Sequence, residues 1–310
     1  MLPSLRILLA LLCYLTFTFF SKAFAEVQLA SGTLETLPSI SYEGIADRPV
    51  QVWLPDEYPA QAPYAVLYMH DGQMLFDSRT TWNGQEWGVD ETASRLIAEG
   101  RTRPFIVVAL HNSEDGRHGD YFPQKARDLM SESSRRVKHP FNRAELRADR
   151  YLEFLVKRVK PYIDTNYKVS RNPENTFIAG SSMGGLISLY AVLEYPQVFS
   201  ATAAISTHWP GIGPEETLPV AESIRKYLRE NLPEPGKHRF YFDHGTETLD
   251  RFYPPLQQAV DKIMRKRGYN DNNWQSRVFV EHTHDEKSWN ARLGHALIFL
   301  LGTEKQRDYQ

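Results

Sequence analysis

Two adjacent serines in a glycine-flanked pentapeptide are the residues whose spacing points most directly to chemistry. Gly180-Ser181-Ser182-Met183-Gly184 matches G-x-S-x-G with Ser182 at its centre. A β-rich run (176–179) precedes it and an apolar helical pattern (184–194) follows it. At a strand-to-helix turn, the central hydroxyl is exposed above the sheet, and the flanking glycines let neighbouring backbone approach. Because Ser181 is off-centre, we predict Ser182 as a nucleophile and the Met183 N–H as an oxyanion donor.

A second oxyanion donor is expected in the loop after an earlier strand. The apolar run 65–69 ends at His70-Asp71-Gly72-Gln73. Gly72 would let the backbone approach a substrate, and the Gln73 N–H would be the donor. By itself an Asp-Gly pair indicates an ordinary turn. The serine motif makes the functional interpretation the better one.

An acid that orients the catalytic base is expected after the run 239–242, since the chain order in such hydrolases is nucleophile, acid, base. Asp243 is expected to lie still within the strand. Glu247 follows Gly245 by only two residues, whereas Asp250 closes the loop. We predict Asp250 as the acid and keep Glu247 as the alternative; the other carboxylate would be a solvated loop residue.

Three histidines could supply the base near the end of the chain. His295 lies inside an expected helix, and His282 is closer to the last strand. We predict His284, which precedes that helix. The pair His282-x-His284 has the spacing of metal ligands, but no matching third ligand stands out, so neither a metal nor a cofactor is predicted.

Alternating β-rich runs and helical patterns predict a mostly parallel sheet covered by helices on both faces, as in the α/β-hydrolase fold. We expect a single catalytic domain over 26–310, with 210–235 as a small cap insertion. The expected strands are 49–54, 65–69, 105–110, 176–179, 201–205, 239–242 and 278–280. The expected helices are 87–99, 150–165, 184–194, 253–267 and 289–301.

The bulk composition is that of an ordinary globular protein. The chain has 310 residues, of which 42% are hydrophobic and 24% are charged, and its formal net charge is −2. This length is enough for one large α/β domain. A nucleic-acid-binding protein would usually show a basic balance or stripe, so no nucleic-acid partner is predicted.

The first 25 residues have the pattern of a secretory signal peptide. Arg6 is followed by the apolar run 7–20 and by the small-x-small sequence Ala23-Phe24-Ala25. Cleavage before Glu26 would remove the single cysteine, Cys13, and leave neither a disulfide nor a membrane segment. An uncleaved anchor is the alternative. We therefore expect a periplasmic or secreted protein of bacterial type.

Taken together, these motifs resemble the esterase family that includes esterase D, enterochelin esterases, feruloyl esterase domains and mycolyltransferase antigens. The likeness covers most of residues 40–302. It is carried by 66–73, 82–90, 180–185, 245–250 and 284–289. The resemblance implies carboxylic-ester chemistry without a cofactor. It supports Ser182, His284, Gln73 and Met183 in the roles given above. The acid departs from the family pattern, because many members have Gly-x-x-Asp and this chain has Thr248 there.

The expected activity is hydrolysis of a small-molecule or carbohydrate ester through a covalent acyl-enzyme. Three alternatives share most of these features: an acyltransferase of the mycolyltransferase type, a siderophore esterase and a non-catalytic binding module. A cationic pocket would favour the siderophore esterase, and Arg117 and Arg292 are the arginines that could meet an anion. The expected substrate-binding residues are His111, Asn112, Arg117, His208 and Trp209.

Overall fold

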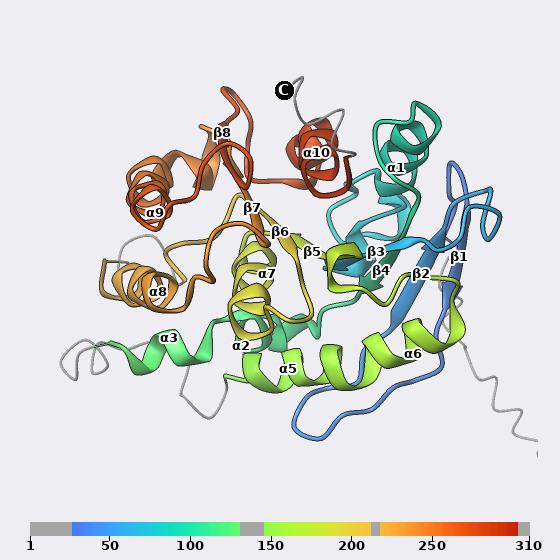
Figure 1. The fold of residues 1–310 in the computed structure, drawn as a ribbon, viewed down its shortest axis with the longest axis horizontal. Coiled ribbons are helices and arrows are strands. Elements are labelled where there is room, and N and C mark those ends of the chain that lie inside the picture. The colour runs from blue at the N-terminus through green and yellow to red at the C-terminus, as the bar shows by residue number, and fades with distance from the viewer. Residues whose placement is uncertain (1–26, 131–145, 212–217, 303–310) are drawn as a thin grey trace, which may run out of the picture.

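A computed structural model describes residues 27–130, 146–211 and 218–302 (Figure 1). The segment expected as a signal peptide lies outside these ranges. The described residues form an eight-stranded sheet in the order β1-β2-β4-β3-β5-β6-β7-β8. The strands are β1 (Thr33–Thr36), β2 (Val50–Leu54), β3 (Ala65–His70), β4 (Phe105–Leu110), β5 (Thr176–Ser181), β6 (Ala201–Ile205), β7 (Arg239–His244) and β8 (Trp274–Val278).

Most of this sheet is parallel, as predicted. The strands β1 and β2 pair antiparallel, as do β2 and β4, and all other neighbours are parallel. The carboxyl ends of β3 to β8 therefore lie along one edge of the sheet. In open α/β sheets, ligands bind at that edge.

Helices cover both faces of the sheet (Figure 1). In Figure 1, α1 and α10 lie above the sheet, and α5, α6 and α7 lie below it. The helices are α1 (Val89–Ala98), α2 (Arg117–Tyr121), α3 (Gln124–Asp128), α5 (Ala148–Phe154), α6 (Lys160–Asn166), α7 (Met183–Glu194), α8 (Leu218–Asn231), α9 (Pro254–Lys266) and α10 (Glu286–Leu301). A π-helical turn, η5 (Leu155–Val159), joins α5 to α6. The fold class agrees with the expectation.

Strand periodicity explains why the core divides into two layers. Successive side chains of a strand point to opposite faces. Accordingly, Val66 and Tyr68 of β3 pack in the cluster that contains α7, whereas Leu67 and Met69 pack in the cluster that contains α10. All six residues of β3 are buried. The uninterrupted apolar run in the sequence is thus the signature of a strand with a helix layer on each side.

The two edge strands were the least predictable. The expected last strand, 278–280, is wrong, because β8 runs over Trp274–Val278. Val278 is 58% exposed and Val280 is 71% exposed, so these valines do not form a buried strand. The strand β1 was missed, since its sequence Thr-Leu-Glu-Thr is mostly polar and exposed. An edge strand needs no apolar run, and hydrophobicity alone does not find it.

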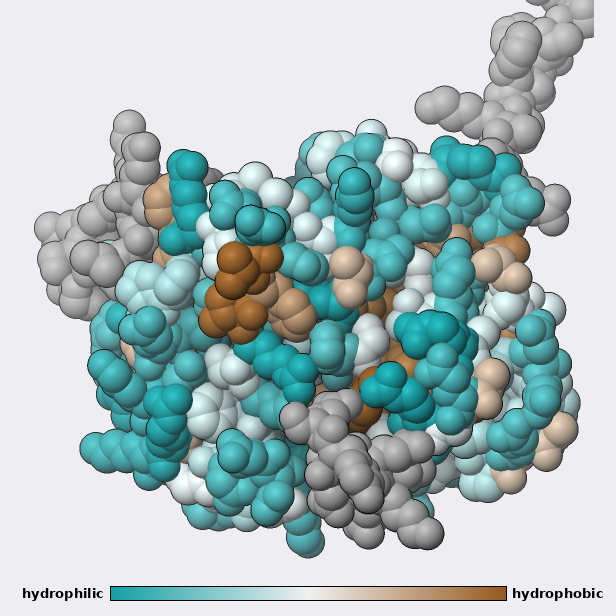
Figure 2. All heavy atoms as spheres, turned by 90° about the horizontal axis from the view of Figure 1, so that it is seen from above, coloured by the Kyte–Doolittle hydropathy of each residue, from teal (hydrophilic) through white to brown (hydrophobic). Residues whose placement is uncertain are grey.

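The segment expected as a cap, 210–235, carries α8; residues 212–217 lie outside the described ranges. Val220, Ile224 and Leu228 of this helix belong to the core. The role of the segment as a cap stays a prediction. No helix in the described ranges is long and apolar enough to cross a bilayer. The face drawn in Figure 2 is mostly hydrophilic and carries only small hydrophobic patches.

A buried carboxylate ties the first described residues to α1. Asp90 is fully buried, and its Oδ2 accepts hydrogen bonds from the backbone N–H groups of Ala30 at 2.7 Å and Ser31 at 3.4 Å. Burial, together with a hydrogen bond to Glu91, raises the pKa of Asp90 to about 7. The folded state therefore favours the protonated acid, although these amide donors oppose that preference.

This raised pKa predicts a stability that falls with pH. A carboxyl whose folded pKa lies above its unfolded value stabilises the fold fully below the unfolded pKa, and loses that contribution as pH rises through the folded pKa. We expect the free energy of unfolding of the wild type to fall between pH 5 and pH 8. The fall should exceed that of Asp90→Asn by at least about 1.4 kcal/mol, which corresponds to one pKa unit. Urea titrations at the two pH values measure this. Asp115→Asn, at an exposed carboxyl, should match the wild type, and equal drops in all three proteins would contradict the prediction.

Candidate active site

Ser182 occupies a sharp turn between β5 and α7. Its backbone has φ 57° and ψ −121°, an unfavourable conformation for a residue with a side chain. The turn is fixed by hydrogen bonds on both sides. The Ser182 N–H donates to Ile205 O at 2.9 Å, and the Ser182 carbonyl accepts from the N–H groups of Leu186 and His208, each at 3.1 Å. A strained serine at this position is the geometry of a nucleophile elbow.

The glycines around Ser182 are required by close packing. A Cβ added to Gly180 would lie 2.8 Å from the carbonyl carbon and oxygen of Gly184. A Cβ on Gly185 would lie 3.2 Å from the carbonyl oxygens of both Gly180 and Ile205. Met183 is the first residue of α7, and the first N–H groups of a helix lack intrahelical acceptors. The turn therefore presents a hydroxyl beside a helix N-terminus.

His284 contacts one of the two acids that the sequence left open. Its Nδ1 lies 2.6 Å from Asp250 Oδ1, and the Asp250 side chain is fully buried. Glu247 is exposed. Since an ionised carboxylate only accepts hydrogen bonds, Nδ1 carries the proton of the neutral ring and Nε2 keeps its lone pair. The Thr248 hydroxyl accepts from the His284 N–H at 2.8 Å, so the residue at the divergent family position holds the histidine loop.

Asp250 has further partners besides His284. Its Oδ2 accepts from the Ser206 hydroxyl and from the Gly245 N–H, each at 2.6 Å. Burial raises the pKa of Asp250, but the hydrogen bond and charge of His284, followed by those two donors, outweigh it and hold the pKa below its usual value. The carboxyl is therefore ionised at neutral pH and can stabilise an imidazolium.

A buried arginine supports this carboxylate from α10. The Arg292 side chain is inaccessible to solvent, and its Nη2 donates to the Ser206 hydroxyl at 2.6 Å and lies 3.6 Å from Asp250 Oδ2. Its Nε lies 3.2 Å from Oδ1 of Asp243, which is also buried, in β7. The indole N–H of Trp289 donates to the same Ser206 oxygen at 3.1 Å. Arg292 thus compensates two buried carboxylates and is not available to an anionic substrate.

The loop after β3 is held against the elbow by Asp71. Its Oδ1 and Oδ2 accept from Nε and Nη2 of Arg117 at 2.7 and 2.8 Å, and Asn112 Nδ2 donates to Oδ1 at 2.7 Å. A Cβ on Gly184 would lie 3.1 Å from Asp71 Oδ2, so the loop touches the first turn of α7. Gly72 packs equally closely on β4, where a Cβ would meet backbone carbons at 2.8 and 2.9 Å. Gln73 lies in the short helix η1 (Gly72–Met74) that this packing fixes.

Aromatic rings enclose His284. The His284 ring packs edge-on against Trp289, with centroids 5.1 Å apart, and against Tyr253, with centroids 5.7 Å apart. The Tyr253 hydroxyl lies 2.7 Å from His208 Nδ1. The His208 N–H in turn donates to the Ser182 carbonyl. His208 and Tyr253 therefore connect the His284 ring to the backbone of Ser182.

Trp209 and the candidates that the sequence analysis did not select make other contacts. Trp209 is a core residue, 2% exposed, whose indole N–H donates to Gln257 at 2.8 Å. His282 Nδ1 lies 3.3 Å from Ser288 O, and His295 Nδ1 lies 2.9 Å from Arg277 Nη1. Asp243 is within β7, as expected. Over the described ranges, no group of three or more His, Cys, Asp or Glu side chains has the arrangement of a metal site.

Two residues of this site carry no motif and were missed. Ser206 has φ 42° and follows β6, the strand that pairs with β5. The available signal was its position, one residue after a predicted strand. Tyr253 starts a helical pattern in the sequence, which indicated packing and nothing more.

Comparison with known proteins was made for the whole chain. The sequence profile of a family described as "Putative esterase" matches residues 45–300. The chain is 21% identical over 275 residues to an uncharacterized protein of Bacillus subtilis, YbbA, covering 86% of this chain and 98% of that one. It is 35% identical over 105 residues to the carboxylesterase SOBER1 of Arabidopsis thaliana, covering 34% of this chain and 41% of that protein.

Solved structures share the fold at low identity. A ferulic acid esterase superposes with a TM-score of 0.61 at 20% identity and covers 87% of this chain and 98% of that chain. The enterobactin esterase of Shigella flexneri has a TM-score of 0.63 at 17% identity, covering 88% of this chain and 60% of the other. The enterobactin hydrolase IroE, solved in complex with DFP, has a TM-score of 0.60 at 16% identity, with 88% and 96% covered. At these identities the likeness establishes the fold.

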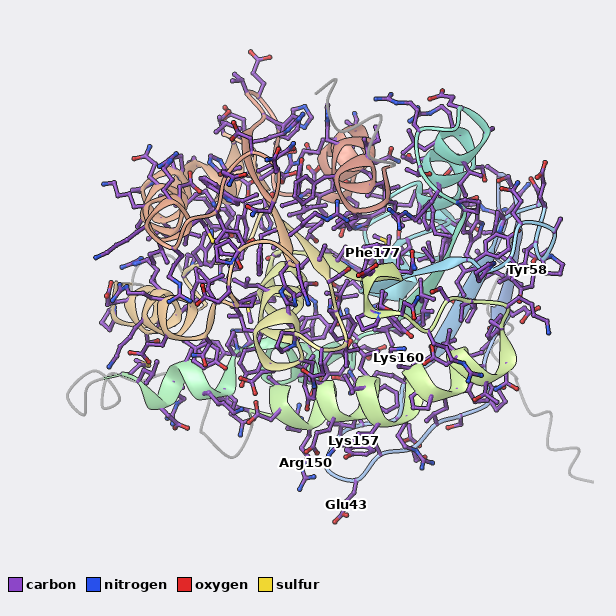
Figure 3. The ribbon with its side chains drawn as sticks, viewed as in Figure 1. Glu43, Tyr58, Arg150, Lys157, Lys160 and Phe177 are labelled. Carbon is purple, nitrogen blue, oxygen red and sulfur yellow. The ribbon has the colours of Figure 1, made fainter. Side chains whose placement is uncertain are left out.

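The buried charges predict a large loss of stability when Arg292 is removed. Arg292→Leu would leave Asp243 and Asp250 buried without their cation, and breaking a buried ion pair costs about 3–5 kcal/mol. Urea unfolding at pH 7 would show this loss. Arg150→Leu is the matched control, because Arg150 is 59% exposed and projects from the outer side of α5 (Figure 3). It should cost no more than about 1 kcal/mol. Similar losses for both variants would contradict the prediction.

Proposed function

The chain belongs to the family described as "Putative esterase", and from this premise we propose that it hydrolyses carboxylic esters through a Ser182-His284-Asp250 triad. The observation that carries the proposal is the 2.6 Å contact between His284 Nδ1 and the buried Asp250 carboxylate, in a chain whose elbow serine is strained. The carboxylesterase and ferulic acid esterase found by comparison are consistent with this chemistry.

In the first step, His284 Nε2 takes the proton of the Ser182 hydroxyl as the oxygen attacks the ester carbonyl. The C=O bond opens to a tetrahedral oxyanion, which accepts hydrogen bonds from the N–H groups of Gln73 and Met183. The imidazolium then gives its proton to the leaving alcohol, and an acyl-enzyme remains. Asp250, held ionised by its donors, stabilises the positive charge on His284.

In the second step, water replaces the alcohol. His284 takes a proton from the water, which attacks the acyl carbonyl, and the proton returns to the Ser182 oxygen as the acid departs. Water is the acceptor that requires no additional site. An acyltransferase would need a pocket that holds an acceptor alcohol in its place, and a product assay with a sugar acceptor separates the two reactions. The signal-peptide pattern supports a periplasmic or secreted location.

Four variants test the triad. We expect Ser182→Ala and His284→Ala to lower kcat for 4-nitrophenyl acetate by about 10⁶-fold, because these residues act as a unit. Asp250→Asn should lower it by about 10⁴-fold, because the histidine loses its orienting partner. Glu247→Gln is the matched control on the same loop and should stay within about threefold of the wild type. If Glu247→Gln lost orders of magnitude and Asp250→Asn did not, the acid would be Glu247. Circular dichroism of each variant controls for folding.

Labelling with a fluorophosphonate tests the nucleophile independently of the substrate. Attack by Ser182 on the probe forms an oxygen–phosphorus bond and expels fluoride. We expect peptide mapping of the intact protein to place one adduct on Ser182, and Ser181→Ala to label at the same rate as the wild type. An adduct on Ser181, or active protein without an adduct on Ser182, would refute the assignment.

A further inference from the structure

A cavity of about 830 Å³ is lined at one end by Gly72 and Gln73, in the loop after β3. This volume lies within the range of small-molecule sites. The cavity starts at Gly72 and Gln73 and reaches the sheet edge at Thr36 and Gln51. Its lining also includes Asp77, Trp82, His111, Asn112, Glu114 and Arg117. Three of the five residues predicted to bind substrate, His111, Asn112 and Arg117, are therefore in one cavity.

Arg117, the cation of this cavity, is already neutralised. Both of its hydrogen-bonding nitrogens contact the Asp71 carboxylate, at 2.7 and 2.8 Å. This bidentate pair uses the Nε–Nη2 edge of the guanidinium and compensates its charge. Asn112 donates to the same carboxylate. Asp71 also lies close to Gly184 and holds the loop after β3, so an anionic ligand would have to compete with this carboxylate for the positive charge of Arg117.

The other polar groups of the lining are neutral or paired. Burial lowers the pKa of His111 to about 4, so the ring is uncharged at pH 7, and its Nε2 lies 2.9 Å from Gln51 Oε1. Asp77 accepts from Arg79 Nη2 at 2.7 Å and from Nε at 3.0 Å. The amide, hydroxyl and imidazole groups of the lining are uncharged, and the threonine hydroxyls keep lone pairs that can accept a further hydrogen bond from an uncharged ligand.

Glu114 makes the net charge of the cavity lining negative. Its side chain is exposed, and within the described ranges it makes no ion pair, unlike Asp77 and Arg117. The N–H of Glu114 donates to Asn112 Oδ1 at 2.9 Å, which ties the backbone of this residue to another residue of the lining. A negative charge at the edge of a cleft repels anions and lowers their local concentration. Trp82, 85% exposed, adds an aromatic surface to the same lining.

From these contacts we propose that the cavity binds an uncharged part of the ester substrate and that Glu114 discriminates against an anionic one. The inference rests on the proposed ester hydrolysis. It distinguishes this chain from an enzyme whose substrate carries several negative charges, as the siderophore alternative would require. The acyl part and the alcohol part of the ester could each enter the cavity, and two substrate series separate them.

The experiment compares kcat/KM for matched neutral and anionic esters, each divided by its rate of hydrolysis in hydroxide. The acyl series is 4-nitrophenyl hexanoate against the mono-4-nitrophenyl ester of adipic acid. The alcohol series is phenyl acetate against 3-carboxyphenyl acetate. We expect the wild type to prefer the neutral ester by about tenfold or more in at least one series. In that series, Glu114→Gln should narrow the preference by roughly threefold and Glu114→Lys by roughly tenfold.

The control is Glu174→Lys, which makes the same charge change at an exposed residue. Glu174 directly precedes β5 and therefore lies at the amino ends of the parallel strands, away from the loops that line the cavity. It should keep the wild-type preference. A wild type that turns over the esters with Ser182 but shows no preference, or a preference that Glu114→Lys leaves unchanged, would overturn the charge selection and leave ester hydrolysis standing. A wild type that turns over none of the four esters would overturn both proposals.

Discussion

The buried carboxylate of Asp250 is the group on which the architecture of the site depends. It needs several donors to remain ionised, and those donors come from separate parts of the chain: Ser206 after β6, Gly245 after β7 and His284 before α10. Burial alone would raise its pKa and weaken its interaction with an imidazolium. Its ionisation therefore links the ends of two strands to the last helix, and a local loop could not supply that environment.

Arg292, on the far side of Asp250 from His284, is also a buried charge that needs compensation. Burying a guanidinium without contact to solvent is costly unless its positive charge is compensated. Here the carboxylates of Asp243 and Asp250 compensate it. The Ser206 hydroxyl connects them, because it accepts from Arg292 and Trp289 and donates to Asp250. This arrangement places the acid by polar contacts on several sides, so the position of His284 follows from the packing of α10 as much as from its own loop.

The sequence predicted the parts of the site that depend on local backbone geometry. The elbow around Ser182 and the Asp71-Gly72 turn have glycines where no Cβ fits, and this leaves a pattern in the chain. The buried central strands were predictable for a similar reason, because two helix layers demand continuous apolar runs. The edge strands β1 and β8 carry no such demand. Ser206 was missed because its contacts depend on the order of the strands, which places β6 next to β5. Neither segment of the sequence indicates that order by itself.

Arg117 shows how tertiary contacts change the meaning of a residue type. In the sequence it is a cation near the ends of strands, which suggests an anionic ligand. In the structure, the Asp71 carboxylate compensates its charge. This ion pair stiffens the loop that would supply the oxyanion donor at Gln73. Loss of this ion pair would therefore loosen the loop after β3. The Arg117–Asp71 pair therefore leaves the adjoining cavity without an uncompensated cation, and the one unpaired charge in the described lining is the carboxylate of Glu114.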